Sequence, residues 1–85
     1  MTTNVQFSGT LSANQTNKWF THSWPVGWHV IWYVMPTSPK SGAPQLDLDV
    51  SVERSDASKC TYWLTVKNLT GQTVNFEARY AVLNN

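Results

Sequence analysis

Hydrophobic and polar residues alternate along most of this chain, the pattern of strands that bury one face of a sheet. The clearest case is the segment 45–54. Its two faces differ in character, with Leu46, Leu48, Val50 and Val52 expected to point inward and Asp47, Asp49, Ser51 and Glu53 outward. No segment repeats hydrophobic residues at the i, i+3, i+4, i+7 spacing of an amphipathic helix. The alternation therefore predicts an all-β protein.

Six strands are expected, at residues 4–12, 18–23, 28–35, 45–54, 60–69 and 73–83. In the first strand, Val5, Phe7 and Leu11 share a face with Gly9, where a glycine permits a bulge or the close approach of another backbone. The last three strands are joined by short polar turns, which predicts an antiparallel meander. The first three strands would then form a second layer over it.

These strands predict a small antiparallel β-sandwich, a single domain over residues 1–85, with a compact barrel as the alternative. The run Thr65-Val-Lys-Asn-Leu-Thr70, followed by an aromatic last strand, resembles immunoglobulin-like and carbohydrate-binding-module-like sandwiches. The resemblance covers about the last third of the chain. It implies the same type of fold and transfers no residue roles.

The most hydrophobic run, Trp24 to Met35, contains three of the five Trp residues. It is too short to span a bilayer, which takes about 20 apolar residues. As a strand it places Trp28, Val30, Trp32 and Val34 toward the core and His29, Ile31, Tyr33 and Met35 on the opposite face. The opposite face is unusually apolar for a surface that only meets water.

A chain of 85 residues buries a modest core, and Cys60 is the only cysteine, so no internal disulfide is possible. Dense aromatic packing or self-association would have to provide the missing stability. The net charge of +1 and the isoelectric point near 7.9 disfavour nucleic acid as a partner.

The first residues have neither the basic start nor the apolar centre of a signal peptide. This favours a cytoplasmic protein, or one secreted by a route without such a signal. The two Asn-X-Thr sequences, at Asn14 and Asn68, are accordingly interpreted as polar turns rather than glycosylation sites.

Catalytic and metal-binding constellations are not evident, so we expect no enzyme, no metal and no cofactor. Asp47, Asp49 and Glu53 lie on a straight strand, which cannot wrap a calcium ion. Cys60, the nucleophile candidate, is expected inward, and neither His22 nor His29 falls at zinc-ligand spacing from it.

Aromatic residues are the strongest functional candidates, because there are more of them than one inner face requires. Trp63 is assigned outward by the alternation of its strand, His29 and Tyr33 lie on the outward side of theirs, and Trp24 sits in a turn. Exposed aromatic rings next to hydroxyl and acidic groups suit sugars, whose C–H faces stack on them, and they also suit protein interfaces.

Two functional hypotheses follow from these aromatics. The first is a non-catalytic, lectin-like module that binds carbohydrate through Trp24, His29, Tyr33 and Trp63. The second is an assembly protein, a homo-oligomer that buries an outer sheet face made of Ile31, Tyr33, Met35 and Trp63. A third interpretation is structural, with the same side chains lying along the sheet or under the loop 37–44.

Overall fold

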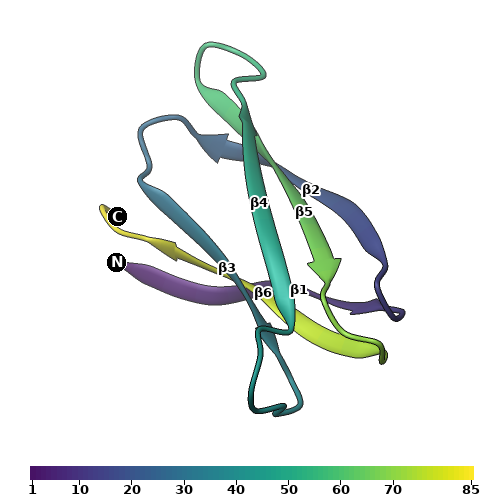
Figure 1. The fold of residues 1–85 in the computed structure, drawn as a ribbon. Coiled ribbons are helices and arrows are strands. Elements are labelled where there is room, and N and C mark those ends of the chain that lie inside the picture. Colours follow the sequence, from purple (N-terminus) through teal and green to yellow (C-terminus); the bar gives the residue numbers. More distant parts are fainter.

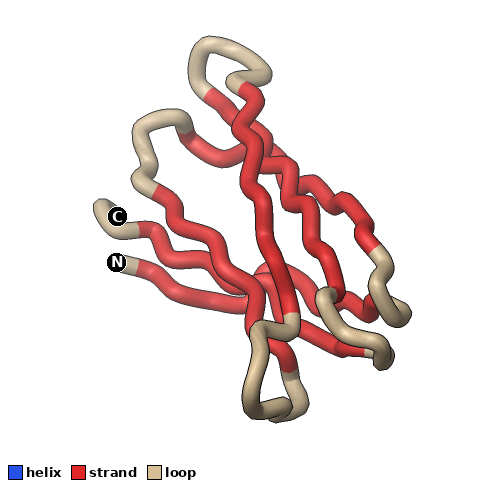
Figure 2. The backbone as a smooth tube through the Cα atoms, in the orientation of Figure 1, coloured by secondary structure: helices blue, strands red, loops and turns tan.

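The computed structural model describes residues 1–85 and contains six strands and no helix, hence no helix capable of crossing a membrane. The strand bounds are β1 Thr2–Leu11, β2 Thr16–Pro25, β3 Val30–Pro36, β4 Leu46–Glu53, β5 Lys59–Asn68 and β6 Val74–Val82. They form two three-stranded antiparallel sheets that face each other, which we call sheet A (β1-β6-β3) and sheet B (β2-β5-β4) (Figures 1 and 2). The two sheets remain separate, so the predicted β-sandwich is confirmed over the closed alternative.

The order of strands within the sheets differs from the expected meander. β4 and β5 do pair as an antiparallel hairpin, but β6 crosses to the other layer and becomes the central strand of sheet A, between β1 and β3. Each sheet therefore combines strands from both halves of the chain. The prediction that β4, β5 and β6 form one sheet is wrong, because a short polar connection suits a crossing between layers as well as a hairpin.

A β-bulge in β1 changes which residues face the core. The register with β6 shifts between Val5 and Phe7, so Gln6 is an extra residue on this strand. One extra residue reverses the side-chain alternation. Phe7 and Leu11 face inward as expected, whereas Val5 faces outward, pairs with Arg79 and is exposed. The glycine expected to permit a bulge, Gly9, instead allows the close approach of the Phe76 ring.

The core is built mainly from aromatic rings. Trp24 lies at its centre and makes edge-to-face contacts with Trp32, Tyr62 and Tyr80, at centroid distances of 5.0 to 6.1 Å. The Trp32 indole N–H is buried without a hydrogen-bond partner. Its neighbours are aromatic faces, which are weak acceptors. Dense aromatic packing therefore replaces the disulfide or metal that small domains often need.

The alternation of β3 is confirmed from Val30 onward, with Trp32 buried and Ile31, Tyr33 and Met35 exposed. The expectation that Trp28 faces the core is wrong, because this residue lies in the turn before β3 and is exposed. On β4 the predicted side-chain directions are confirmed, but the predicted burial of the inner residues is not. Val50 and Val52 pair with Leu64 and Tyr62 and so lie on the inner side, but both remain exposed. β4 is an edge strand, and the opposite sheet does not cover this half of it.

Asn68 joins the two turns at one end of the sandwich. Its side chain is fully buried, and its Nδ2 donates to the carbonyl oxygens of Leu11, Ser12 and Gln72. Its Oδ1 accepts hydrogen bonds from the backbone N–H and the hydroxyl of Thr70. The amide thus serves as a structural cross-link, which agrees with the interpretation of Asn68-Leu-Thr as a turn.

Candidate functional site

An aromatic strip lies on the outer face of sheet B. Phe20 on β2 and Trp63 on β5 are directly paired across the strands, and Ser51 on β4 completes the row. The Phe20 and Trp63 ring centroids are 5.1 Å apart with planes tilted by 35°, and the His22 ring lies 6.2 Å beyond Phe20. Phe20 is 58% exposed, an unusual value for a phenylalanine with a core available on the other side of its strand.

Polar side chains surround this strip and hold it in position. The Trp63 Nε1 donates a 3.0 Å hydrogen bond to Glu53 Oε1, which fixes the orientation of the indole on the sheet surface. The other carboxylate oxygen of Glu53 has no hydrogen-bond partner within the protein. The next row along the strands consists of Lys18, Thr65 and Asp49, which pair across the three strands. The face thus combines a rigid aromatic surface with hydrogen-bonding groups at its border.

The structure separates the four residues expected to form one ligand site. Trp24 is buried, with only 8% of its surface exposed, and its Nε1 donates to Thr21 Oγ1. The expectation that Trp24 is exposed at a turn is therefore wrong. β2 continues through it to Pro25, and Ser23 takes a positive φ of 69° within a register shift between Thr21 and Trp24. This irregularity directs Trp24 into the core.

The other three residues lie at separate places. Trp63 is on the outer face of sheet B, and Tyr33 is on the outer face of sheet A, beneath the guanidinium of Arg79 at 5.8 Å. His29 is exposed just before β3, where its backbone N–H donates to the Asn84 side chain. The outer face expected to unite Ile31, Tyr33 and Met35 with Trp63 is likewise divided between the two sheets.

Phe20 and Glu53 are the residues of the strip that sequence reasoning did not select. Trp19 and Phe20 are adjacent, and only the structure shows which ring is inside: Trp19 packs against Phe7 and Phe76, at centroid distances of 5.7 and 5.4 Å. A pairing of β2 with β5 would have placed Phe20 beside Trp63. The sequence offered no signal for that pairing, because the two strands are far apart along the chain.

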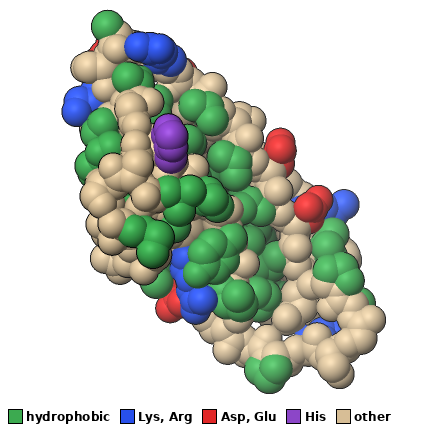
Figure 3. All heavy atoms as spheres, turned by 90° about the vertical axis from the view of Figure 1, so that its left-hand side faces the viewer, with side chains coloured by type: hydrophobic (Ala, Val, Ile, Leu, Met, Phe, Trp, Pro, Cys, Tyr) green, Lys and Arg blue, Asp and Glu red, His purple; other side chains and the backbone are tan.

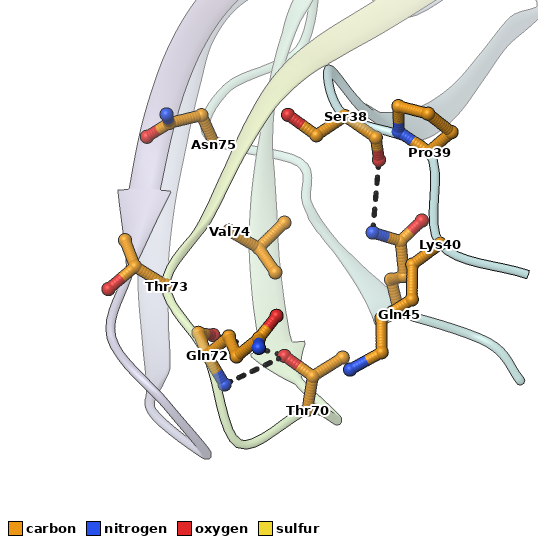
Figure 4. Close-up of a pocket in the computed structure, with 9 residues that line it drawn as sticks. All are labelled: Ser38, Pro39, Lys40, Gln45, Thr70, Gln72, Thr73, Val74 and Asn75. Atoms are coloured by element: carbon orange, nitrogen blue, oxygen red, sulfur yellow. Dashed lines mark hydrogen bonds between the residues drawn. The ribbon is translucent and has the colours of Figure 1, made fainter.

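A pocket lies apart from this strip at the end of the sandwich, between the loop before β4 and the turn before β6 (Figure 4). This pocket has a volume of about 220 Å³ and is lined almost entirely by polar residues, including Ser38, Lys40, Gln45, Thr70, Gln72 and Asn75. Gln45 Nε2 donates to the Ser38 carbonyl across it. No aromatic ring lines the pocket, so a ligand there would be held without aromatic stacking.

Titratable groups do not converge at either site. No three side chains of the metal-binding types His, Cys, Asp and Glu come together, and Cys60 is buried in the core. Comparisons with protein-family models, curated proteins and solved structures gave no match to this chain. The function must therefore be argued from the geometry of these surfaces.

Proposed function

We propose that this chain is a non-catalytic, lectin-like module that binds carbohydrate on the outer face of sheet B. The observation that carries the proposal is the Phe20–Trp63 pair on this face, in which Phe20 is exposed and Trp63 is half-buried, set among polar groups. An aromatic surface that is open to water gains nothing from it, whereas the apolar C–H face of a sugar ring stacks on such a surface. The polar groups around it then bind the hydroxyls at the edge of the sugar.

The arrangement of the strip suits a chain of sugars better than a single ring. Neighbouring strands lie about 4.8 Å apart, so the row from Phe20 to Trp63 to Ser51 spans roughly 10 Å. His22 extends the aromatic surface on the side of Phe20. The sheet is also open at this face, without a wall that would enclose one residue. An oligosaccharide lying across the strands would contact all of these groups.

Charge points to a neutral sugar. The charged side chains of this face are Lys18, Lys59, Lys67, Asp47, Asp49 and Glu53, three bases and three acids whose charges balance. The Glu53 carboxylate accepts the hydrogen bond from Trp63, so the negative charge of a sugar acid stacked on the indole would be repelled by it. The unpartnered oxygen of Glu53 is instead suited to accept a hydrogen bond from a sugar hydroxyl, a charge-assisted and relatively strong bond.

Calorimetric titration with neutral oligosaccharides, selected on a glycan array, tests this proposal. A stacking contact contributes about 0.5–1.5 kcal/mol. Phe20→Ala and Trp63→Ala should therefore each weaken binding by about 2- to 12-fold. Tyr33→Ala removes an exposed ring of similar size from the opposite sheet and serves as the matched control.

The melting temperatures of all variants should be compared with that of the parent protein, so that unfolding is not taken for lost binding. Binding that falls in the sheet B variants and not in Tyr33→Ala supports the proposal. Equal affinities in all three variants, or no neutral glycan bound at millimolar concentrations, would refute it.

A further inference from the structure

We propose that two copies of this chain associate face to face through the outer surface of sheet A. Five hydrophobic residues on this surface are each 40% to 53% exposed: Val5, Ile31, Tyr33, Met35 and Leu83. The register places the first four in neighbouring rows across β1, β6 and β3, and Leu83 follows β6 on the same side. Figure 3, viewed from the side of β3 and the chain termini, shows hydrophobic side chains gathered around a basic and an acidic group.

The two charges in this apolar surface lie on the central strand. Arg79 forms the one salt bridge of the protein, to Glu77 at 2.8 Å. Arg79 is flanked in register by Val5 on one side and Tyr33 on the other. Hydrogen bonds to Glu77 and Tyr33 raise the pKa of Arg79, so its charge is retained. The surface therefore has one positive and one negative group at its middle, an apolar border along β3, and a mixed border along β1, where Val5 alternates with Thr3 and Ser8.

This charge pattern is complementary to itself. We place a twofold axis between the sheet A faces of the two copies, perpendicular to the strands and level with Ala78. This axis would stack the β6 strands of the two copies antiparallel to each other. Arg79 of each copy would then face Glu77 of the other. Val34 pairs with Ala78, so the same axis sets Tyr33 opposite Met35 of the second copy. Sulfur–aromatic contacts of this kind are favourable, and an isologous interface repeats every contact twice.

The outer face of sheet B does not offer an equivalent surface, because three carboxylates and three lysines are spread over it. Charged residues are depleted from interface cores. A standard interface covers about 800 Å² on each partner, which is a sizeable part of the 5233 Å² surface of this chain. The whole outer face of sheet A must take part to reach that size. We therefore expect a reversible dimer with a micromolar dissociation constant.

Dimerisation through sheet A would leave both sheet B faces pointing outward on opposite sides of the assembly. If sheet B binds carbohydrate as proposed above, the dimer is a bivalent module that cross-links glycans. Two linked sites gain avidity on a multivalent surface without any new contact at either site. This consequence depends on the proposed function, whereas the interface itself does not.

Sedimentation velocity over a concentration series from about 1 µM to 1 mM tests the interface, together with two charge reversals. Arg79→Glu gives a face with two carboxylates, and Glu77→Arg gives one with two guanidinium groups. Each variant alone should lose the dimer, with the dissociation constant raised about 100-fold by like charges. An equimolar mixture should restore it as a heterodimer. Lys18→Glu, a reversal on sheet B, is the control and should leave dimerisation unchanged.

A parent protein that stays monomeric up to 1 mM would overturn the interface, as would an Arg79→Glu variant that dimerises with the dissociation constant of the parent. If the charge variants fail to fold, Ile31→Ser should show the same loss of dimer, because this residue is 53% exposed and its replacement leaves the core intact. Monovalent glycan affinity should be equal in Arg79→Glu and the parent. Loss of the interface is therefore read from sedimentation, and loss of the sugar site from glycan affinity, so the failure of one proposal can be told from the failure of the other.

Discussion

Replacing the buried amide of Asn68 by Ala should destabilise the protein strongly. The side chain has two N–H groups directed at three carbonyl oxygens and one oxygen that accepts two hydrogen bonds from Thr70. The Nδ2 group has only two hydrogens for its three acceptors, so it forms about two full hydrogen bonds. With the two that Oδ1 accepts, the side chain makes about four. At about 1 kcal/mol each, the substitution should lower the free energy of unfolding by about 4 kcal/mol.

That loss is large for this chain, since 85 residues correspond to a total stability of only about 4–13 kcal/mol. Urea unfolding followed by tryptophan fluorescence measures it, with the slope checked for two-state behaviour. Thr70→Val removes only the hydroxyl of the network and should cost about 1–2 kcal/mol. Asn17→Ala, at an exposed position on β2, should stay within about 0.5 kcal/mol.

Asn68→Asp provides a sharper form of the test, because it keeps the shape and replaces the donor by an oxygen. A carboxylate there would face the carbonyl oxygens of Leu11, Ser12 and Gln72, so at neutral pH it should destabilise more than Asn68→Ala does. Protonation should recover part of the loss as the pH falls. A cost below 1 kcal/mol for Asn68→Ala would show that the network does not join the two turns.

Three further predictions concern the core and the sheet B face. Gly9→Ala places a Cβ 2.6 Å from the Phe76 ring and should cost about 1–3 kcal/mol in urea unfolding, whereas Gly27→Ala, with open space around it, should cost far less. Burial and the nearby Cys60 raise the pKa of Tyr62 to about 12, so its contribution to stability is complete below pH 10 and is lost as the pH rises through 12. Tyr62→Phe should remove that part of the alkaline destabilisation, and an unchanged pH profile of stability would contradict the assignment. Glu53→Gln keeps an acceptor for Trp63 Nε1 but removes the charge, so glycan affinity should fall about 3-fold with stability unchanged, and no fall would exclude Glu53 from the site.

The strands were predictable from the sequence because each buries one face, and alternation reports that directly. The partition of the strands between sheets was not predictable in the same way. Alternation tells which side of β6 is buried, and it does so equally well whether β6 lies beside β5 or in the opposite layer. The bulge at Gln6 also leaves no mark in the sequence, and it turned Val5 to the surface.

The candidate site was predictable only at Trp63, where strong alternation on both sides assigned the indole outward. Trp24 was misplaced because the positive φ of Ser23 shifts the register just before it. Phe20 could not be assigned beside the adjacent Trp19 without knowledge of the pairing with β5. The polar pocket was missed because two segments distant along the chain, 38–45 and 70–75, form it together.

The most direct test of a carbohydrate site on sheet B is a titration of the protein with a neutral oligosaccharide, followed through the five tryptophan indole N–H signals by NMR. Trp63→Phe assigns the signal of interest. The account predicts that the Trp63 indole shifts most and that those of the buried Trp24 and Trp32 shift little. Shifts confined to the side-chain amides of Gln45, Gln72 and Asn75, with a stationary Trp63 signal, would place the ligand in the polar pocket and contradict the account.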